Sequence, residues 1–252
     1  MVNVKGKWAL VTGATRGIGY GAAIFMAEQG CNLLLHGRTE ENLQKVVNDA
    51  KALGVEAVPV AAELSDISQV EAMLKKIDEL GMDVDIVLNN AGVQIAYRTE
   101  YLDTPVSDYD ISFKINTIAP MVITYHFLPK MAAKGFGRIV NTTSGIRKEP
   151  EQAGYSASKA ALDKVTMDLA NVYNGTDVIV SLTDPGWCRT DLGGPSAPNS
   201  PESSIPGVIV GAFVDDKKSG RCFAATDFHG MNLEEAVKYA EEKVPGYIGT
   251  IG

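Results

Sequence analysis

Short apolar runs alternate with longer amphipathic segments along almost the whole chain. Apolar runs predict buried strands at 7–12, 32–36, 57–61, 85–89, 138–143, 178–182 and 221–226. Between them, apolar residues recur at helical spacing and predict helices at 17–30, 39–54, 67–80, 107–133, 155–173 and 232–243. Strands that are apolar throughout and alternate with helices are typical of a parallel sheet with helices on both faces.

No linker or shift in composition divides the chain, so residues 1–252 are predicted to form a single α/β domain with a Rossmann-like, doubly wound parallel sheet. The segment 193–206 is rich in Pro, Ser and Gly and predicts a mobile loop over a substrate site. In the tail, 227–252, the apolar stripe of the predicted helix either covers the core or joins subunits.

Composition removes several classes of function. A formal charge of −8 and a pI of about 5.0 argue against non-specific binding to nucleic acid or to an anionic membrane. Neither a secretory leader nor an apolar run of membrane-spanning length is evident. The three cysteines are scattered and favour a reducing, cytoplasmic location, and no metal site is expected because the histidines lack ligand spacing.

A glycine-rich turn joins the first predicted strand to the first helix. Gly13, Gly17 and Gly19 allow a tight turn and a close approach to a pyrophosphate, and the following helix offers oriented N–H groups. The spacing G-x-x-x-G-x-G, with Thr15, Arg16 and Ile18 between the glycines, therefore predicts a dinucleotide site.

The residue after the second strand indicates which dinucleotide binds. An acidic side chain there would bind the ribose 2′-hydroxyl of NAD. This chain has Gly37 and Arg38 instead, and Arg16 can reach the same region from the glycine turn. Because a guanidinium group suits phosphate oxygens, we predict NADP(H).

Tyr155 and Lys159 are four residues apart on a predicted helix and therefore share one face. A lysine held beside a tyrosine favours the phenolate, which makes the phenol useful for acid–base chemistry near neutral pH. Such a pair is also a common feature of solvated helix faces, so its meaning depends on the other motifs.

Together these segments resemble the short-chain dehydrogenase/reductase family over residues 5–192. The match rests on the glycine turn, Asn89-Asn90-Ala91-Gly92, the segment Pro185-Gly186-Trp187-Cys188-Arg189-Thr190, and an ordered tetrad of Asn116, Ser144, Tyr155 and Lys159. Two features depart from the family pattern: Glu63-Leu64 stands where an aspartate near the adenine is usual, and the segment from Ser144 to Tyr155 is short.

The resemblance implies hydride transfer between nicotinamide and a carbonyl or alcohol carbon. Tyr155 would be the general acid or base, Lys159 would lower the pKa of Tyr155 and bind the ribose, and Ser144 would donate to the substrate oxygen. Asn116 would hold a water. The implied cofactor contacts are the glycine turn (Gly13, Thr15, Arg16, Gly17, Ile18, Gly19), Arg38, Glu63, Leu64, Asn89, Ala91, Gly92, Tyr155, Lys159, Pro185, Gly186, Cys188 and Thr190.

Alternatives remain at this stage. The chain could be a catalytically silent NADP(H)-binding redox sensor, which retention of both Tyr155 and Lys159 disfavours. It could also be an epimerase or dehydratase, but few residues follow Thr190 to form the larger substrate domain of such relatives. Family members are commonly homodimers or homotetramers, and the small carbonyl or alcohol substrate is not identified by any motif.

Overall fold

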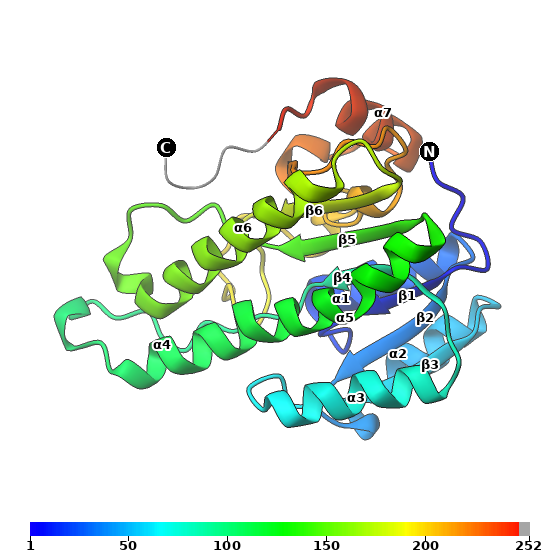
Figure 1. Ribbon diagram of the computed structural model, residues 1–252. Helices are drawn as coiled ribbons and strands as arrows, with labels where there is room; N and C mark the ends of the chain where they lie inside the picture. Colours follow the sequence, from blue (N-terminus) through cyan, green and yellow to red (C-terminus); the bar gives the residue numbers. More distant parts are fainter. Residues whose placement is uncertain (247–252) are drawn as a thin grey trace.

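A computed structural model describes residues 1–246 and contains one sheet. All its strands are parallel, in the order β3-β2-β1-β4-β5-β6-β7 (Figure 1). The strands are β1 (Trp8–Val11), β2 (Asn32–Gly37), β3 (Ala57–Ala61), β4 (Val84–Asn89), β5 (Gly137–Thr142), β6 (Val178–Asp184) and β7 (Cys222–Ala224). The predicted doubly wound parallel sheet is therefore confirmed.

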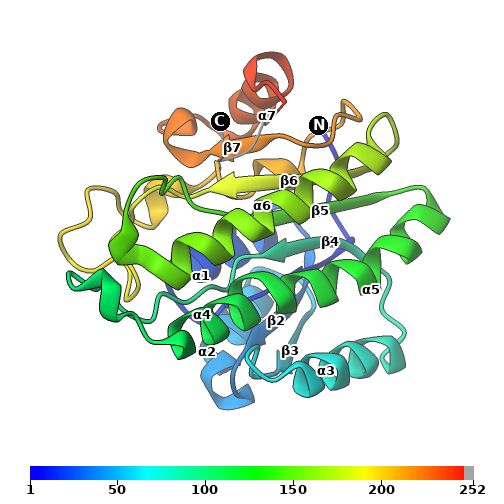
Figure 2. The same cartoon turned by 60° about the vertical axis from the view of Figure 1, so that its left-hand side comes forward.

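The helices form a layer on each face of the sheet (Figures 1 and 2). One layer contains α1 (Gly17–Glu28), α2 (Glu40–Ala52) and α7 (Leu233–Lys243). The other contains α3 (Ile67–Glu79), α4 (Val106–Phe113), α5 (Ala119–Lys134) and α6 (Ala153–Tyr173). Successive strand residues alternate between the two cores: Leu33 and Leu35 of β2 face the first, and Leu34 faces the second.

Side chains at the helix starts explain why several boundaries could be predicted. Thr39 accepts a hydrogen bond from the backbone N–H of Asn42 at the start of α2. Asn232 and Glu235 form a reciprocal capping box at the start of α7. These bonds satisfy N–H groups that have no partner inside the helix.

Two elements differ from the sequence prediction. The single helix expected at 107–133 is interrupted by a π-helical turn, η2 (Lys114–Ile118), between α4 and α5. The last strand is shorter than 221–226, because the chain leaves β7 at Ala224 and enters a 3-10 turn, Ala225–Phe228.

The predicted loop 193–206 is hydrogen-bonded at its base. Asn199 bridges to Trp187 and Arg189 through backbone bonds, and the side chain of Arg189 donates to the carbonyls of Ala197 and Pro198. The expectation of a mobile loop therefore does not extend to this base. In the tail, the apolar stripe of α7 packs into the core, with Ala236, Val237 and Ala240 buried; part of the tail, 247–252, lies outside the described residues.

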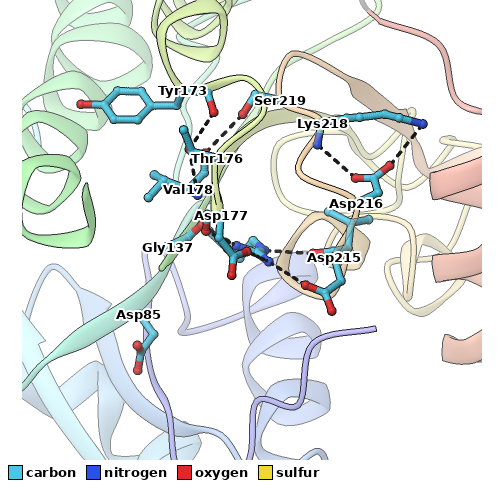
Figure 3. Close-up of polar contacts among 12 residues, drawn as sticks. Asp85, Gly137, Tyr173, Thr176, Asp177, Val178, Asp215, Asp216, Lys218 and Ser219 are labelled. Atoms are coloured by element: carbon cyan, nitrogen blue, oxygen red, sulfur yellow. Dashed lines mark hydrogen bonds and ion pairs between the residues drawn. The ribbon is translucent and has the colours of Figure 1, made fainter. Parts of the chain in front are cut away.

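A buried arginine ties the amino-terminal edge of β5 to a distant loop. Arg138 is fully buried; it donates to the carbonyls of Val214 and Asp177 and forms ion pairs with the carboxylates of Asp177 and Asp215. Figure 3 shows Asp177 and Asp215 on these two segments, with the arginine side chain between them. Beside them, Asp216 accepts from the backbone N–H of Lys218.

The strand order places the candidate site. β1 lies between β2 and β4, so the connections after β1 and β4 run to opposite sides and leave a crevice at the carboxyl edge of the sheet. The glycine turn, the segment 89–92, Ser144 and the segment 185–190 lie at or just beyond strand ends on this edge, whereas Asn116, Tyr155 and Lys159 lie on helical segments. Within residues 1–246, none of the helices combines the length and apolar character needed to cross a bilayer.

Candidate active site

The glycine turn after β1 packs directly against the residues that follow β4. A Cβ on Gly13 would lie 3.0 Å from the Cα of Ala91, and Gly13 has a φ of +67°, which favours glycine. A Cβ on Gly19 would overlap the carbonyl oxygen of Gly13 and the side-chain amide of Asn90. The turn can therefore approach this closely only with glycine at both positions.

The start of α1 is free to bind an anion. Its N-cap residue, Arg16, makes no side-chain capping bond, so the first N–H groups of the helix remain available. Gly17 lies against Thr190, whose methyl group would be 3.2 Å from a Cβ at that position. The structure thus brings the glycine turn and the Pro185–Thr190 segment together, although they are far apart in the sequence.

Position 37 cannot accommodate the acid typical of an NAD site. A Cβ on Gly37 would lie 2.8 Å from the methyl carbon of Thr15. The next residue, Arg38, is exposed and forms no ion pair with any residue between 1 and 246. Arg16 is also exposed and pairs with Asp191 at 3.1 Å, a contact that solvent weakens. Both arginines are therefore accessible to a phosphate.

The π-helical turn carries Asn116, which is fully buried. Its side-chain oxygen accepts from the N–H of Val93, and its amide donates to the carbonyl of Val93 and to the hydroxyl of Ser158. A π turn inserts an extra residue into a helix and is frequent at functional sites. The side chain here fastens the strand-end segment 91–93 to α6.

Lys159 reaches from α6 to the carboxyl end of β5. Its ammonium group donates to the carbonyl oxygen of Thr142 at 2.7 Å, and a Cβ on Gly92 would be 3.3 Å from it. Burial lowers the pKa of Lys159 to about 8, although Asp163 and Asp184 act in the opposite direction. The group is thus much closer to its titration point at neutral pH than an exposed lysine.

Ser144 lies close enough to Tyr155 for its hydroxyl to affect the phenol. Burial raises the pKa of the Tyr155 phenol, the hydroxyl of Ser144 acts to lower it, and the charge of Asp184 raises it further. The ammonium of Lys159 lies 5.9 Å from the centre of the Tyr155 ring. Burial therefore dominates this pKa in the protein alone, and the lowering of the pKa by Lys159 stays a prediction.

In the segment after β6, the thiol of Cys188 points into the protein. Cys188 is buried, and its sulfur lies 2.9 Å from the hydroxyl of Ser204 and 3.2 Å from the carbonyl oxygen of Pro185. Burial raises the pKa of this thiol, which agrees with a packing role rather than a nucleophilic one. Gly186 has a φ of +72°, and its N–H donates to the carboxylate of Asp184.

Three predicted cofactor residues are bonded to other protein groups or packed in the core. The amide of Asn89 is buried and donates to the side chain of Asn141, and Leu64 is buried in the core beneath α3. The carboxylate of Glu63 accepts from the N–H and hydroxyl of Ser65. These residues hold the strand ends in place, and Glu63 keeps its second oxygen for another donor.

Sequence reasoning missed residues whose role depends on strand pairing. Asn90 donates to the carbonyl of Thr12, and Thr12 in turn accepts from the N–H of Ala91, so the pair fastens the ends of β1 and β4. Asn90 belongs to the motif Asn89-Asn90-Ala91-Gly92, so the sequence contained a signal that could have identified this residue. Asp184 carries its charge beside Gly145, within 2.7 Å of a Cβ there, and only the structure places it next to Tyr155.

A glycine-lined crevice at the sheet's switch point, with a serine, a tyrosine and a lysine beside it, defines an oxidoreductase that uses a dinucleotide. The family model for short chain dehydrogenase matches residues 7–200. This chain therefore belongs to the short-chain dehydrogenase family, as its motifs predicted.

Curated relatives agree with this assignment. An uncharacterized oxidoreductase, YvrD, from Bacillus subtilis is 32% identical over 192 residues, which cover 75% of this chain and 72% of that protein. The oxidoreductase UcpA from Escherichia coli K12 is 33% identical over 212 residues, covering 81% of this chain and 80% of UcpA.

Solved structures share the fold. A metagenomic short-chain oxidoreductase in complex with NADP has a TM-score of 0.71 at 29% identity, over 80% of this chain and 88% of that one. A protein from Escherichia coli CFT073, assigned to the short-chain dehydrogenases and complexed with NADPH, has a TM-score of 0.79 at 25% identity, over 88% and 98%.

Proposed function

We propose that this protein reduces the carbonyl group of a small ketone or aldehyde, or oxidises the corresponding secondary alcohol, with a nicotinamide cofactor. The observation that carries the proposal is the grouping of Ser144 and Tyr155 beside the buried ammonium of Lys159, which lies 5.9 Å from the centre of the Tyr155 ring. This pair lies at the same edge of the sheet as the glycine turn. A proton donor for the carbonyl oxygen and a hydride donor for the carbonyl carbon can therefore reach the same carbonyl group.

NADP(H) is the cofactor that fits this site. Gly13, Gly17 and Gly19 let the turn pack closely against its neighbours, and the start of α1 supplies N–H groups without a side-chain cap for the pyrophosphate. Arg16 and Arg38 are exposed cations where the 2′-phosphate is expected, and Gly37 excludes a repelling carboxylate. The two similar structures solved with NADP or NADPH support the same choice.

The bound cofactor supplies hydride chemistry, and the side chains position and polarise the substrate. Tyr155 donates its phenolic proton to the carbonyl oxygen during reduction, and its raised pKa keeps that proton in place until it is needed. Ser144 donates to the same oxygen as negative charge develops. Lys159, a cation at neutral pH, stabilises the phenolate that remains.

The opening of the site is apolar at two points. Tyr97 is 58% exposed and Trp187 is 59% exposed, so both rings are available to contact a substrate. Trp187 is held in place because its indole N–H donates to the carbonyl of Gly193. This contact supports a substrate role for the loop 193–206, which its composition predicted.

The proposal is tested by measuring NADPH oxidation with a panel of ketones, aldehydes, sugars, steroids and acyl thioesters, for the wild type and for Tyr155→Phe. We expect turnover with at least one carbonyl class, and a loss of about 10²- to 10⁴-fold in kcat for the variant. NADPH affinity is expected to stay within a factor of about three, because the phenol acts on the substrate. Tyr173→Phe, on the same helix but about five turns further on, is the matched control.

A catalytically silent, NADP(H)-binding sensor is the second candidate, and no feature of the site favours it over the enzyme. Tight NADPH binding with no oxidation by any substrate of the panel would establish it instead.

We also propose a cytoplasmic homo-oligomer, since all three cysteines are free thiols and the outer faces of α5 and α6 expose Tyr125 and Val172. Sedimentation equilibrium measures the oligomeric state directly.

A further inference from the structure

The imidazole of His36 lies under the glycine turn and is 2% exposed. His36 comes one residue before the end of β2. Its Nδ1 accepts a hydrogen bond from the backbone N–H of Gly13 at 3.2 Å, and its Nε2 lies 3.1 Å from the carbonyl oxygen of Ala62. One side chain thus connects the glycine turn, β2 and the residue that follows β3.

These two partners determine the protonation state of the ring. A carbonyl oxygen only accepts, so Nε2 must carry a hydrogen, and a backbone N–H only donates, so Nδ1 must be bare. His36 is therefore neutral and in a single tautomer. Burial lowers its pKa below the usual value for histidine, while the bond to Ala62 and the charge of Glu63 act in the opposite direction.

The backbone of His36 holds the next residue of the turn as well. Its carbonyl oxygen accepts from the N–H of Ala14 at 2.9 Å. Two successive N–H groups, those of Gly13 and Ala14, are therefore bound to the same residue. They precede the free N–H groups at the start of α1, so their position sets where those groups point.

We propose that His36 is a positioning residue that holds the glycine turn in its phosphate-binding form and makes NADP(H) affinity decrease in acid. The role rests on the NADP(H) site proposed above and does not depend on which substrate is reduced. When the ring gains a second proton, Nδ1–H faces the N–H of Gly13, and two donors oppose each other in a buried place. The turn must then move away from its cofactor-binding position.

The charges around the ring allow this effect to be isolated. Among residues 1–246, the titratable group that acts on His36 is Glu63, on the segment after β3. Arg16 and Arg38 extend into solvent from the turn and from the end of β2. The 2′-phosphate of the cofactor also titrates, near pH 6, so wild type and variants must be compared with the same ligand.

The test measures the Kd of NADP+, which is the probe, by titration calorimetry between pH 5 and pH 8 for the wild type, His36→Asn and His36→Leu. The side-chain oxygen of Asn can take the place of Nδ1 and accept from Gly13, whereas Leu removes the acceptor. At pH 8 we expect Kd to rise about tenfold or more in His36→Leu and to stay within about threefold in His36→Asn. Below the pKa of His36, the wild type should lose up to tenfold per pH unit relative to His36→Asn.

A measurement on the wild type alone covers the case in which a variant does not fold. The protection factor of the Gly13 amide in hydrogen exchange, that is, its rate relative to the intrinsic rate at the same pH, should be high at pH 8 and should fall in acid, while the protection of neighbouring amides stays the same. Equal NADP+ affinity and equal pH dependence in all three proteins would overturn the role of His36 alone. A wild type that binds no NADP+ would instead overturn the cofactor site, and this role with it.

Discussion

Lys159 illustrates how burial changes the energetics of a single side chain. Its folded pKa is about 8, against 10.5 in an exposed setting, so the folded protein binds fewer protons than the unfolded chain between these values. Within this window, its contribution makes the free energy of unfolding rise with pH. Below pH 8 the buried lysine is charged, so the folded state carries the full free-energy cost of removing that charge from water.

We predict that, relative to Lys159→Met, the wild type becomes more stable by about 1.4 kcal/mol per pH unit between pH 8 and pH 10.5. Urea unfolding of both proteins at several pH values measures this difference. Ionisation of Cys31 and Cys222, whose pKa values are raised by burial, affects both proteins equally and cancels. A constant difference across the window would show that Lys159 titrates normally.

At the residue scale, we expect Arg38 to set the choice of cofactor. Arg38→Asp replaces a cation with a carboxylate beside the expected 2′-phosphate, so the preference for NADPH over NADH should fall by about 10- to 100-fold. The ratio of kcat/KM with the two cofactors is the measurement. Lys75→Glu, an exposed position on α3, reverses a charge in the same way and should leave the ratio unchanged. An unaltered ratio in Arg38→Asp would remove Arg38 from the phosphate site.

At the scale of elements, α1 contains a matched pair of glycines. A Cβ on Gly19 would overlap the carbonyl of Gly13, whereas a Cβ on Gly21 would meet only the side chain of Ile205 at 3.8 Å. Gly19→Ala should therefore displace the glycine turn, abolish measurable NADPH binding and reduce stability by a few kcal/mol, about the cost of overpacking.

Gly21→Ala should bind NADPH normally and gain up to about 1 kcal/mol of stability, because alanine is the better helix former. Thermal unfolding and fluorescence titration with NADPH measure both effects. Similar behaviour of the two variants would mean that the close contact of Gly19 is not what shapes the turn.

The elements also show which features a sequence can predict. Local signals placed α2 and α7 well, because Thr39 and Asn232 cap their own helices. The π turn at 114–118 has no local signal, since Asn116 occupies it through bonds to Val93 and Ser158 on other segments. The site motifs could be recognised from spacing, but the partners of His36 follow from how β2 pairs with β3.

At the scale of the whole molecule, Arg138 connects β5 to two other segments: the turn before β6, which carries Asp177, and the loop that carries Asp215. Its pairs with Asp177 and Asp215 are buried on the arginine side (Figure 3). Arg138→Met would remove these pairs and leave the carbonyls of Val214 and Asp177 without their donor, and because both carboxylates are partly exposed we expect a loss of about 1–3 kcal/mol.

Lys164→Met is the control, because Lys164 pairs with Asp168 on the exposed surface of α6. Removing a pair of this kind usually changes stability by less than about 1 kcal/mol. Urea unfolding at pH 7 compares the two variants with the wild type. A small effect for Arg138→Met would mean that methionine packing replaces the ion pairs.

The contact of Gly17 with Thr190, and of Gly13 with Ala91, has a consequence for folding. The crevice exists only when β1, β4 and β6 have all taken their places in the sheet, and pairing of distant parallel strands is intrinsically slow. NADP(H) can therefore stabilise the completed sheet but not an intermediate that lacks one of these strands. During refolding, acquisition of cofactor affinity should be among the last events, after most of the helical signal has returned.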